Sequence, residues 1–261
     1  MSIRKAAKAA KSGASPAPAP AAGRVRALLA ELERLGSARN REGMARYGIV
    51  ATRVFGVSVA TLRGIAKRIG RDHELAAALW ASGWYEARLL AAFVDEPGRV
   101  TPAQMDRWAR DFENWADCDT VCFHLFDKTP HAFGRVDRWA QRQGEFVRRA
   151  AFALLASLAL HAKQAPGEEF RRRLALVERA SGDGRNFVKK AVSWALRSIG
   201  HRADLRAAAL ATARRLARSD IASARWIGRD ALRDLERGES RPALGGSDRG
   251  PRSLSVRRRA R

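Results

Sequence analysis

The segment Phe187–Gly200 combines aromatic and cationic side chains at helical spacing. Lys190, Trp194 and Arg197 occupy positions i, i+4 and i+7, so a helix would place all three on one stripe. An indole between two cations suits a surface that faces a polyanion better than one that faces water alone. The alternative is that Trp194 packs in the core, as helical tryptophans commonly do.

A strong positive charge is distributed over the whole chain. Its 261 residues include 50 Lys or Arg and 27 Asp or Glu, which gives a formal net charge of +23. Residues 1–24 contribute +5 and residues 240–261 contribute +6, so residues 25–239 still carry +12. Nucleic acid is therefore the leading class of partner, because cations that neutralise phosphates release counterions. A drift of composition toward Arg and Ala, caused by high-GC codons, is the alternative.

Other classes of site are disfavoured. Cys118 and Cys122 lie four residues apart, and although His124 and His131 are near, no zinc ligand set with the usual spacing is complete. We expect a reduced cysteine pair, no metal and no cofactor. No apolar run approaches the roughly 20 residues of a membrane span, and the N-terminus does not read as a secretory signal. We expect a cytoplasmic, nucleoid-associated protein.

Related helical segments recur in the second half of the chain, at Phe146–Leu160, Phe187–Gly200 and Ser223–Leu235. The first two begin 41 residues apart, and the tripeptide Ala-Leu-Arg recurs after 36 residues. A period of about 35–45 residues made only of helices is typical of stacked HEAT or armadillo helix pairs. The sequence therefore predicts an all-α fold, an α-solenoid of HEAT-like helical repeats with a concave basic face.

Helix signals continue through the first half, whereas strand signals are nearly absent. Thr101 precedes Pro102 as an N-cap precedes a proline at the first helical position. We predict helices within Val25–Gly36, Ser58–Gly70, His73–Gly83, Trp84–Pro97, Thr101–Asn114 and Trp115–Lys128. The corresponding domain boundaries are a disordered basic tail over residues 1–24, one folded domain over 25–238 and a disordered Arg-rich tail over 239–261.

Four motifs resemble the AlkD-type DNA alkylation repair glycosylases, and the resemblance extends over residues 45–236. They are Gly56–Lys67, Glu113–Asp119, Phe146–Leu155 and Arg185–Arg202. The resemblance implies that a concave surface holds duplex DNA and that the protein cleaves the N-glycosidic bond of cationic alkylated purines, of the 3-alkyladenine and 7-alkylguanine type. It also implies that the base is not rotated fully into a pocket, unlike in most glycosylases.

The resemblance also implies which residues carry the chemistry. The family's Trp and Asp, one helical turn apart, fall on Trp115 and Asp119, its Arg on Arg149, and its second Trp on Trp194. Asp117 is a second acid beside Asp119, but the i, i+4 spacing favours Asp119 as the partner of Trp115. A carboxylate can stabilise an oxocarbenium-like sugar and position water, while the cationic base leaves readily.

Four further cations are expected to contact DNA: Lys190, Arg197, Arg148 and Arg88. Arg88 suits either a phosphate contact or a solvated surface. Either Arg148 or Arg149 could point inward, and the match of Arg-Arg-Ala-Ala to Lys-Lys-Ala-Val pairs Arg149 with Lys190. The remaining tryptophans have apolar neighbours at helical spacing and are predicted to pack in the core, namely Trp80, Trp84, Trp108, Trp139 and Trp226.

The leading hypothesis is thus a monomeric DNA-alkylpurine N-glycosylase that acts on alkylated double-stranded DNA. One rival is a HEAT-repeat protein that binds damaged or branched DNA without catalysis. The retained acid at Asp119 argues against that rival. A second rival is a protein-interaction scaffold, which a neutral or acidic concave face would favour and the basic stripe does not.

Overall fold

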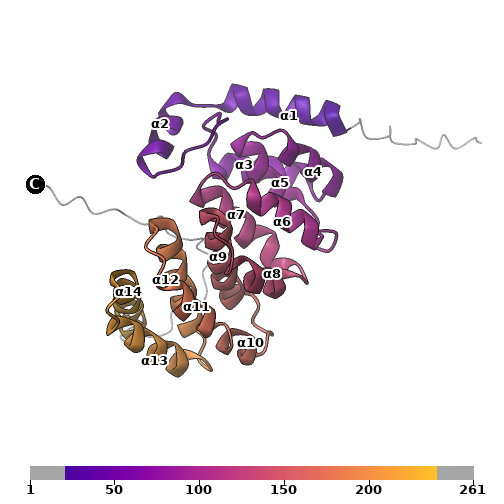
Figure 1. Ribbon diagram of the computed structural model, residues 1–261. Helices are drawn as coiled ribbons and strands as arrows, with labels where there is room; N and C mark the ends of the chain where they lie inside the picture. Colours follow the sequence, from indigo (N-terminus) through magenta and orange to yellow (C-terminus); the bar gives the residue numbers. More distant parts are fainter. Residues whose placement is uncertain (1–20, 240–261) are drawn as a thin grey trace, which may run out of the picture. The chain divides into compact units, whose positions relative to one another are not determined.

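The chain is helical wherever its structure is described. The computed structural model describes residues 21–239, which form α-helices and one 3-10 turn and contain no strand (Figure 1). The all-α prediction is confirmed. The predicted tails fall mostly outside the described residues, except that the first helix begins at Ala21, four residues before the predicted start at Val25. Two compact units are distinguished, with the boundary between Leu154 and Leu155.

The first unit consists of two rows of helices. Its elements are α1 (Ala21–Leu35), α2 (Ala38–Arg46), α3 (Val59–Ile69), α4 (His73–Ala81), α5 (Tyr85–Val94), α6 (Pro102–Arg110), α7 (Trp115–His124), η1 (Phe126–Lys128), α8 (Ala132–Trp139) and the first part of α9 (Glu145–His161). Helix α5 packs against both α3 and α7, so these three form one row. Helix α4 packs against α1 and α5, and α6 packs against α8 (Figure 1).

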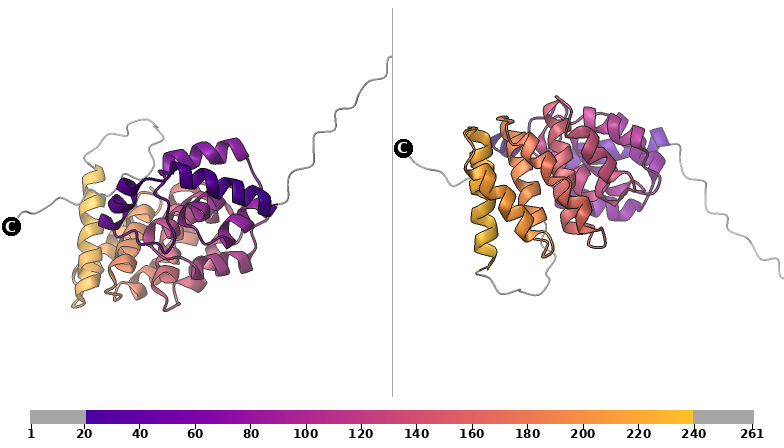
Figure 2. Two further views of the ribbon diagram at one scale, coloured as in Figure 1. Left: turned by 90° about the horizontal axis from the view of Figure 1, so that it is seen from above. Right: turned by 60° about the horizontal axis from the view of Figure 1, so that its bottom comes forward.

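The second unit repeats the paired arrangement. It holds the end of α9 followed by α10 (Gly167–Arg171), α11 (Leu174–Ala180), α12 (Asn186–Gly200), α13 (Arg206–Ala217) and α14 (Ala222–Glu239). Helix α12 packs against α11, α13 and α14, and the last three helices run side by side (Figure 2). The repeated sequence segments therefore correspond to α9, α12 and α14, and both α12 and α14 pack against the helix that precedes them.

Local sequence accounts for the helix ends. The Ser58 side chain accepts a hydrogen bond from the Thr61 backbone N–H, and α3 ends at Gly70, whose φ of 80° is easily adopted only by glycine. Thr101 caps α6 with Pro102 at its first position. These ends lie where the sequence predicted them.

Tryptophans form much of the core of the first unit. Trp80 stacks on Trp108 with 4.0 Å between ring centroids, and Trp139 is buried nearby against Phe126. Two of these buried indole N–H groups bond to carboxylates: Trp80 donates to Asp111 at 2.8 Å, and Trp139 donates to Asp106 at 2.7 Å. The packing role predicted for these three tryptophans is confirmed.

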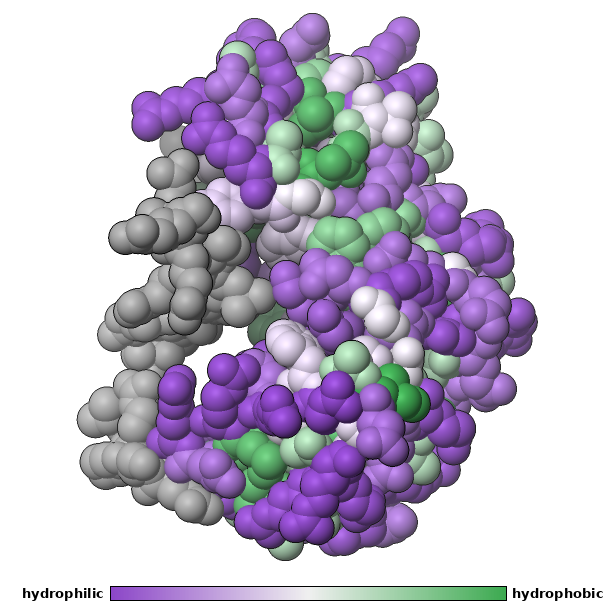
Figure 3. Space-filling model, turned by 60° about the vertical axis from the view of Figure 1, so that its left-hand side comes forward, coloured by the Kyte–Doolittle hydropathy of each residue, from purple (hydrophilic) through white to green (hydrophobic). Residues whose placement is uncertain are grey.

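The surface is dominated by charge. Hydrophilic side chains cover most of the face in Figure 3, and hydrophobic ones gather there only in small patches. Among residues 21–239, the exposed large hydrophobic side chains are Leu35, Tyr47, Val50, Val59 and Ile221. Two of them, Tyr47 and Val50, lie in the loop between α2 and α3, which contacts the start of α7.

Candidate active site

A capping box fixes the start of α7. The Asn114 side chain accepts a hydrogen bond from the Asp117 backbone N–H at 3.1 Å, and the Asp117 carboxylate accepts one from the Asn114 backbone N–H at 3.3 Å. This reciprocal pair satisfies backbone donors that a helix start leaves open. Trp115 thus stands at the first helical position, and Asp119 follows one turn later.

Asp119 is paired with Arg149 of α9. The guanidinium donates from Nε to one carboxylate oxygen at 2.9 Å and from a terminal nitrogen to the other at 2.6 Å. The Asp119 and Arg149 side chains are 19% and 7% exposed, so the pair is largely shielded from water while part of the Asp119 side chain stays accessible. A fork of this kind fixes both the position and the plane of the carboxylate.

Burial and the ion pair act in opposite directions on this carboxyl group. Burial raises the pKa of Asp119 above its ordinary value, and the Arg149 guanidinium opposes that shift. Burial lowers the pKa of Arg149, but the adjacent Asp119 raises it more, so the guanidinium remains charged. Arg149 is therefore the group that favours an ionised Asp119.

Cys118 and Cys122 form further hydrogen bonds between α7 and α9. Both are free and fully buried, and their thiols donate to the backbone oxygens of Phe146 and Ala150 at 3.7 and 3.6 Å. Burial raises the pKa of the Cys118 thiol well above its usual value, which keeps it protonated. Among residues 21–239, no three His, Cys, Asp or Glu side chains are grouped as a metal site requires.

Asp117 differs from Asp119 in its surroundings. It is 1% exposed, and its oxygens accept hydrogen bonds from backbone N–H groups of Glu113, Asn114 and Cys118. Burial raises its pKa to about 7, against the effect of these hydrogen bonds. Asp117 therefore serves the helix start, and Asp119 is the acid of this turn whose side chain is partly exposed.

Trp115 holds the loop between α2 and α3 in place. The half-buried indole donates from Nε1 to the Tyr47 backbone oxygen at 3.0 Å. The Asn114 amide donates to the Val50 backbone oxygen at 3.2 Å, and the Thr52 N–H donates to Glu113 at 2.8 Å. Tyr47 is 60% exposed beside Trp115 and was missed as a candidate, although its aromatic ring just before a turn was a usable signal.

Glu86 secures the other end of the same loop. Its carboxylate is fully buried and accepts hydrogen bonds from the backbone N–H groups of Phe55, Gly56 and Val57. Gly56 has a φ of 85°, which turns these three N–H groups toward one point. Glu86 was not predicted as a functional residue, because a long-range backbone contact leaves no local sequence pattern.

The expected DNA contacts in the first unit have protein partners. Arg88 is 13% exposed, donates to the Asp111 backbone oxygen at 2.9 Å, and pairs with Glu113 at 3.1 Å. Arg148 donates to the Arg142 backbone oxygen at 2.7 Å. Arg88 thus supports the segment that leads into α7, and its guanidinium already has an acidic partner there.

The other predicted residues lie in the second unit. On α12, Lys190 is exposed and Trp194 is half-buried. Arg197 lies 3.5 Å from Asp230 and 3.6 Å from Asp234, which offset its charge. The convergence of Trp194 with the residues of the first unit stays a prediction.

Two tryptophans predicted to pack in the core are only half-buried. Trp226 of α14 lies beneath the ammonium group of Lys189, 4.8 Å from the ring centroid. Trp84, likewise half-buried, stacks on Phe55 with 3.9 Å between ring centroids. Apolar neighbours at helical spacing predicted a contact surface for these rings but not how much of each ring it would cover.

Comparison with known proteins gives one family and one fold. A family model described as DNA alkylation repair enzyme matches residues 28–235. No curated protein matches in sequence. A solved structure from a new family of proteins related to the HEAT-like repeat DNA glycosylases, with affinity for branched DNA structures, has a TM-score of 0.70 at 22% identity, covering 82% of this chain and 94% of that one.

At this identity the structural match establishes the fold, and the HEAT-like repeat prediction is confirmed. The curvature and charge of the predicted concave face stay predictions. None of the helices within residues 21–239 combines the length and apolar character needed to span a membrane.

Proposed function

We propose, because the chain belongs to the DNA alkylation repair enzyme family, that it hydrolyses the N-glycosidic bond of cationic alkylated purines in duplex DNA. The observation that carries the proposal is the Asp119 carboxylate, fixed by Arg149 and one helical turn from the half-buried Trp115. A partly accessible carboxylate held in one plane beside an aromatic ring suits a cationic transition state.

The reaction needs little help at the base. A 3-alkyladenine or 7-alkylguanine base carries a positive charge, and the electron pair of the breaking C1′–N bond neutralises it. Positive charge then develops on the sugar, where the Asp119 carboxylate stabilises it. Water adds its oxygen to C1′ and loses a proton to solvent or to the carboxylate. The products are the neutral free base and an abasic sugar, so the step balances without metal or cofactor.

Arg149 and the tryptophans have supporting roles in this proposal. Arg149 keeps Asp119 ionised and oriented, which a neutral partner could not do. Trp115 packs on the deoxyribose, where its ring face favours positive charge, and Trp194 is a proposed aromatic DNA contact of the second unit. The exposed Tyr47, bonded through its backbone to Trp115, extends this aromatic surface.

Backbone phosphates are the proposed source of affinity. The net charge of +12 on residues 25–239 supports electrostatic binding of double-stranded DNA. Lys190 and Arg148 are proposed direct phosphate contacts. Arg197 and Arg88 form ion pairs with acidic neighbours. These pairs favour a structural role over direct contact with DNA: Arg197 holds α12, and Arg88 holds the segment that precedes α7.

A second candidate function is binding of branched DNA without excision. It is favoured by the similar solved structure, whose family has affinity for branched DNA structures. The two candidate functions differ in whether Asp119 performs chemistry.

Release of free base separates the two. Purified full-length protein is incubated with methylated duplex DNA, and 7-methylguanine and 3-methyladenine are measured by chromatography, with and without EDTA. We expect release of both bases that persists in EDTA. Tight binding of a four-way junction with no base release would favour the second candidate.

A further inference from the structure

A second basic site occupies the first unit, away from Asp119. The C-terminal ends of α3, α5 and α7 border a shallow pocket of about 370 Å³. Its walls include three cations, Arg63, Lys67 and Arg71, together with the rings of Phe93 and His124. Nothing described above assigns a role to these residues.

The three cations are spaced four residues apart and are all exposed. This spacing puts Arg63 and Lys67 on one side of α3, and Arg71 continues that side just past the helix end. Within residues 21–239, no Asp or Glu side chain forms an ion pair with any of the three, and none borders the pocket. The positive charge of this pocket is therefore not offset by neighbouring acids.

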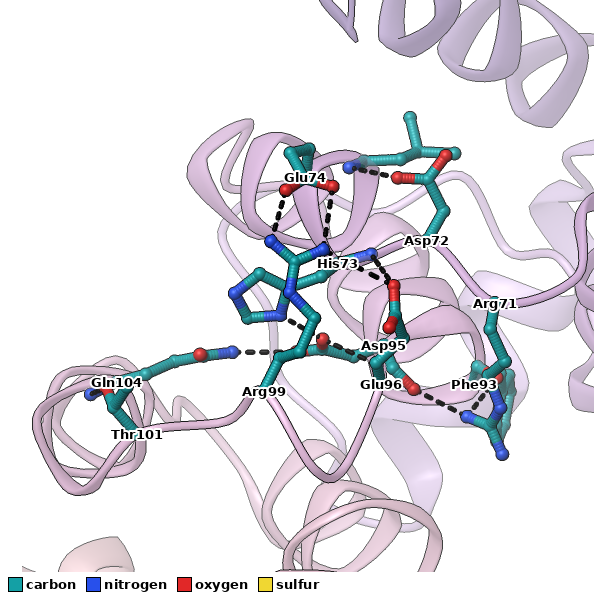
Figure 4. Close-up of polar contacts among 11 residues, drawn as sticks. Arg71, Asp72, His73, Glu74, Phe93, Asp95, Glu96, Arg99, Thr101 and Gln104 are labelled. Atoms are coloured by element: carbon teal, nitrogen blue, oxygen red, sulfur yellow. Dashed lines mark hydrogen bonds and ion pairs between the residues drawn. The ribbon is translucent and has the colours of Figure 1, made fainter.

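Neutral acceptors hold both guanidinium groups of the pocket in place. Arg71 donates to the backbone oxygens of Phe93 and Asp95 at 3.1 and 2.6 Å (Figure 4). Arg63 contacts His124 Nε2 at 3.1 Å, and its guanidinium carbon lies 5.9 Å from the centre of the Phe93 ring. Because arginine only donates, His124 Nε2 is the acceptor in this contact. These contacts position Arg63 and Arg71 without cancelling their charge.

Stabilisation of helix ends explains only part of this arrangement. Cations near a helix C-terminus interact favourably with its partial negative charge, which amounts to about half a unit. Three such ends would offset about 1.5 of the three positive charges. Arg63 stands in the middle of α3 rather than in its last turn, so helix-end stabilisation gives no reason for its presence there.

We propose that this pocket binds a backbone phosphate of the DNA whose damaged nucleotide lies at Asp119. The inference rests on the proposed function for the identity of the ligand. On α7, Asp119 and His124 are five residues apart, which is about 7.5 Å along the helix axis. Asp119 faces α9 through Arg149, and His124 faces α3 and α5. The pocket therefore lies beside the Asp119 site rather than in it, and the phosphate that it binds belongs to a nucleotide near the damaged one.

The salt dependence of DNA binding tests this proposal. Affinity of the full-length protein for undamaged duplex is measured from 50 to 300 mM NaCl for the wild type and for Arg63→Gln/Lys67→Gln. The logarithm of the binding constant falls with the logarithm of the salt concentration, and each lost phosphate contact makes this slope about 1 less steep. We expect a slope reduced by about 1 to 2 and at least tenfold weaker binding at low salt.

The control variant is Arg107→Gln/Arg110→Gln, which removes two exposed cations from α6 in the same unit. Its slope should stay within half a unit of the wild-type slope, and Arg63→Lys/Lys67→Arg should restore the wild-type slope. Equal slopes for the Gln pair and the wild type would overturn the phosphate pocket, even if the wild type excises bases. A reduced slope in a protein that releases no base would support the pocket and refute the excision.

Discussion

Arg149 donates one hydrogen bond to each carboxylate oxygen of Asp119, at 2.9 and 2.6 Å, across the contact between α7 and α9. The carboxylate therefore has a fixed plane and a permanent positive neighbour. Two buried cysteines attach the same helices to each other behind the pair. Such support from packed helices is what a positioned electrostatic group requires.

Loss of Arg149 should destabilise the fold and impair excision together. Arg149→Gln leaves a largely buried carboxylate without its cation, which costs about 3 kcal/mol because Asp119 keeps some exposure. Urea unfolding followed by circular dichroism measures this. The control is Arg215→Gln, whose exposed pair with Glu178 should contribute less than about 1 kcal/mol. Similar losses for both variants would show that the Asp119 pair is not specially buried.

The same variant should change the pH dependence of base release. Burial raises the pKa of Asp119, and without the opposing guanidinium that pKa rises further. Because the ionised acid is the active form, Arg149→Gln should need a higher pH to reach its maximum rate. Single-turnover release between pH 5 and 9 measures this. An acid limb at the same pH as in the wild type would contradict the assigned role.

Asp117 should make the fold less stable as pH rises. Burial raises its pKa from 3.8 to about 7 in the folded chain. Between about pH 4 and 7 the unfolded chain gives up this proton while the folded chain keeps it, so the free energy of unfolding falls over that window. Asp117→Asn stays neutral and should lack this fall, although the lost acceptor lowers its stability at pH 4. Denaturation curves at several pH values measure the free energy of unfolding of both proteins. If this free energy changes with pH in the same way for both, the raised pKa of Asp117 is contradicted.

Replacing two glycines by alanine should have opposite effects on the stability of the fold. Gly56 has a φ of 85°, and a Cβ there would collide with the Ser37 backbone oxygen, so Gly56→Ala should cost about 2 kcal/mol or more. Gly64 lies within α3 with open space around its Cα, so Gly64→Ala should stabilise by about 1 kcal/mol. Thermal unfolding checks both. A stable Gly56→Ala protein would mean that the loop to Tyr47 is not held as described.

Periodicity and caps predicted the elements because they are local. Ser58, Gly70 and Thr101 mark helix ends through contacts within a few residues, and the repeated segments share one helical period. Helical spacing likewise put Trp115 and Asp119 on one turn. These features depend on neighbours in the sequence, so the sequence was sufficient for them.

Long-range partners could not be predicted in this way. The acids that offset the charge of Arg197 come from α14, more than 30 residues away, and the partner of Arg88 comes from the lead-in to α7. Glu86 bonds to backbone atoms about 30 residues earlier, and backbone atoms have no residue signature. A charged residue on a helix face thus has the same sequence pattern whether it is solvated or paired.

The most direct measurement is single-turnover release of 7-methylguanine from methylated duplex by Asp119→Asn. The substitution keeps the size of the side chain and removes the charge that would stabilise the sugar, so the rate should fall by about 10²–10³. DNA affinity should stay equal or rise, because a negative charge near phosphates is lost. The matched control is Asp220→Asn, an exposed acid of the second unit, which should excise at the wild-type rate. Release at the wild-type rate by Asp119→Asn would contradict the account.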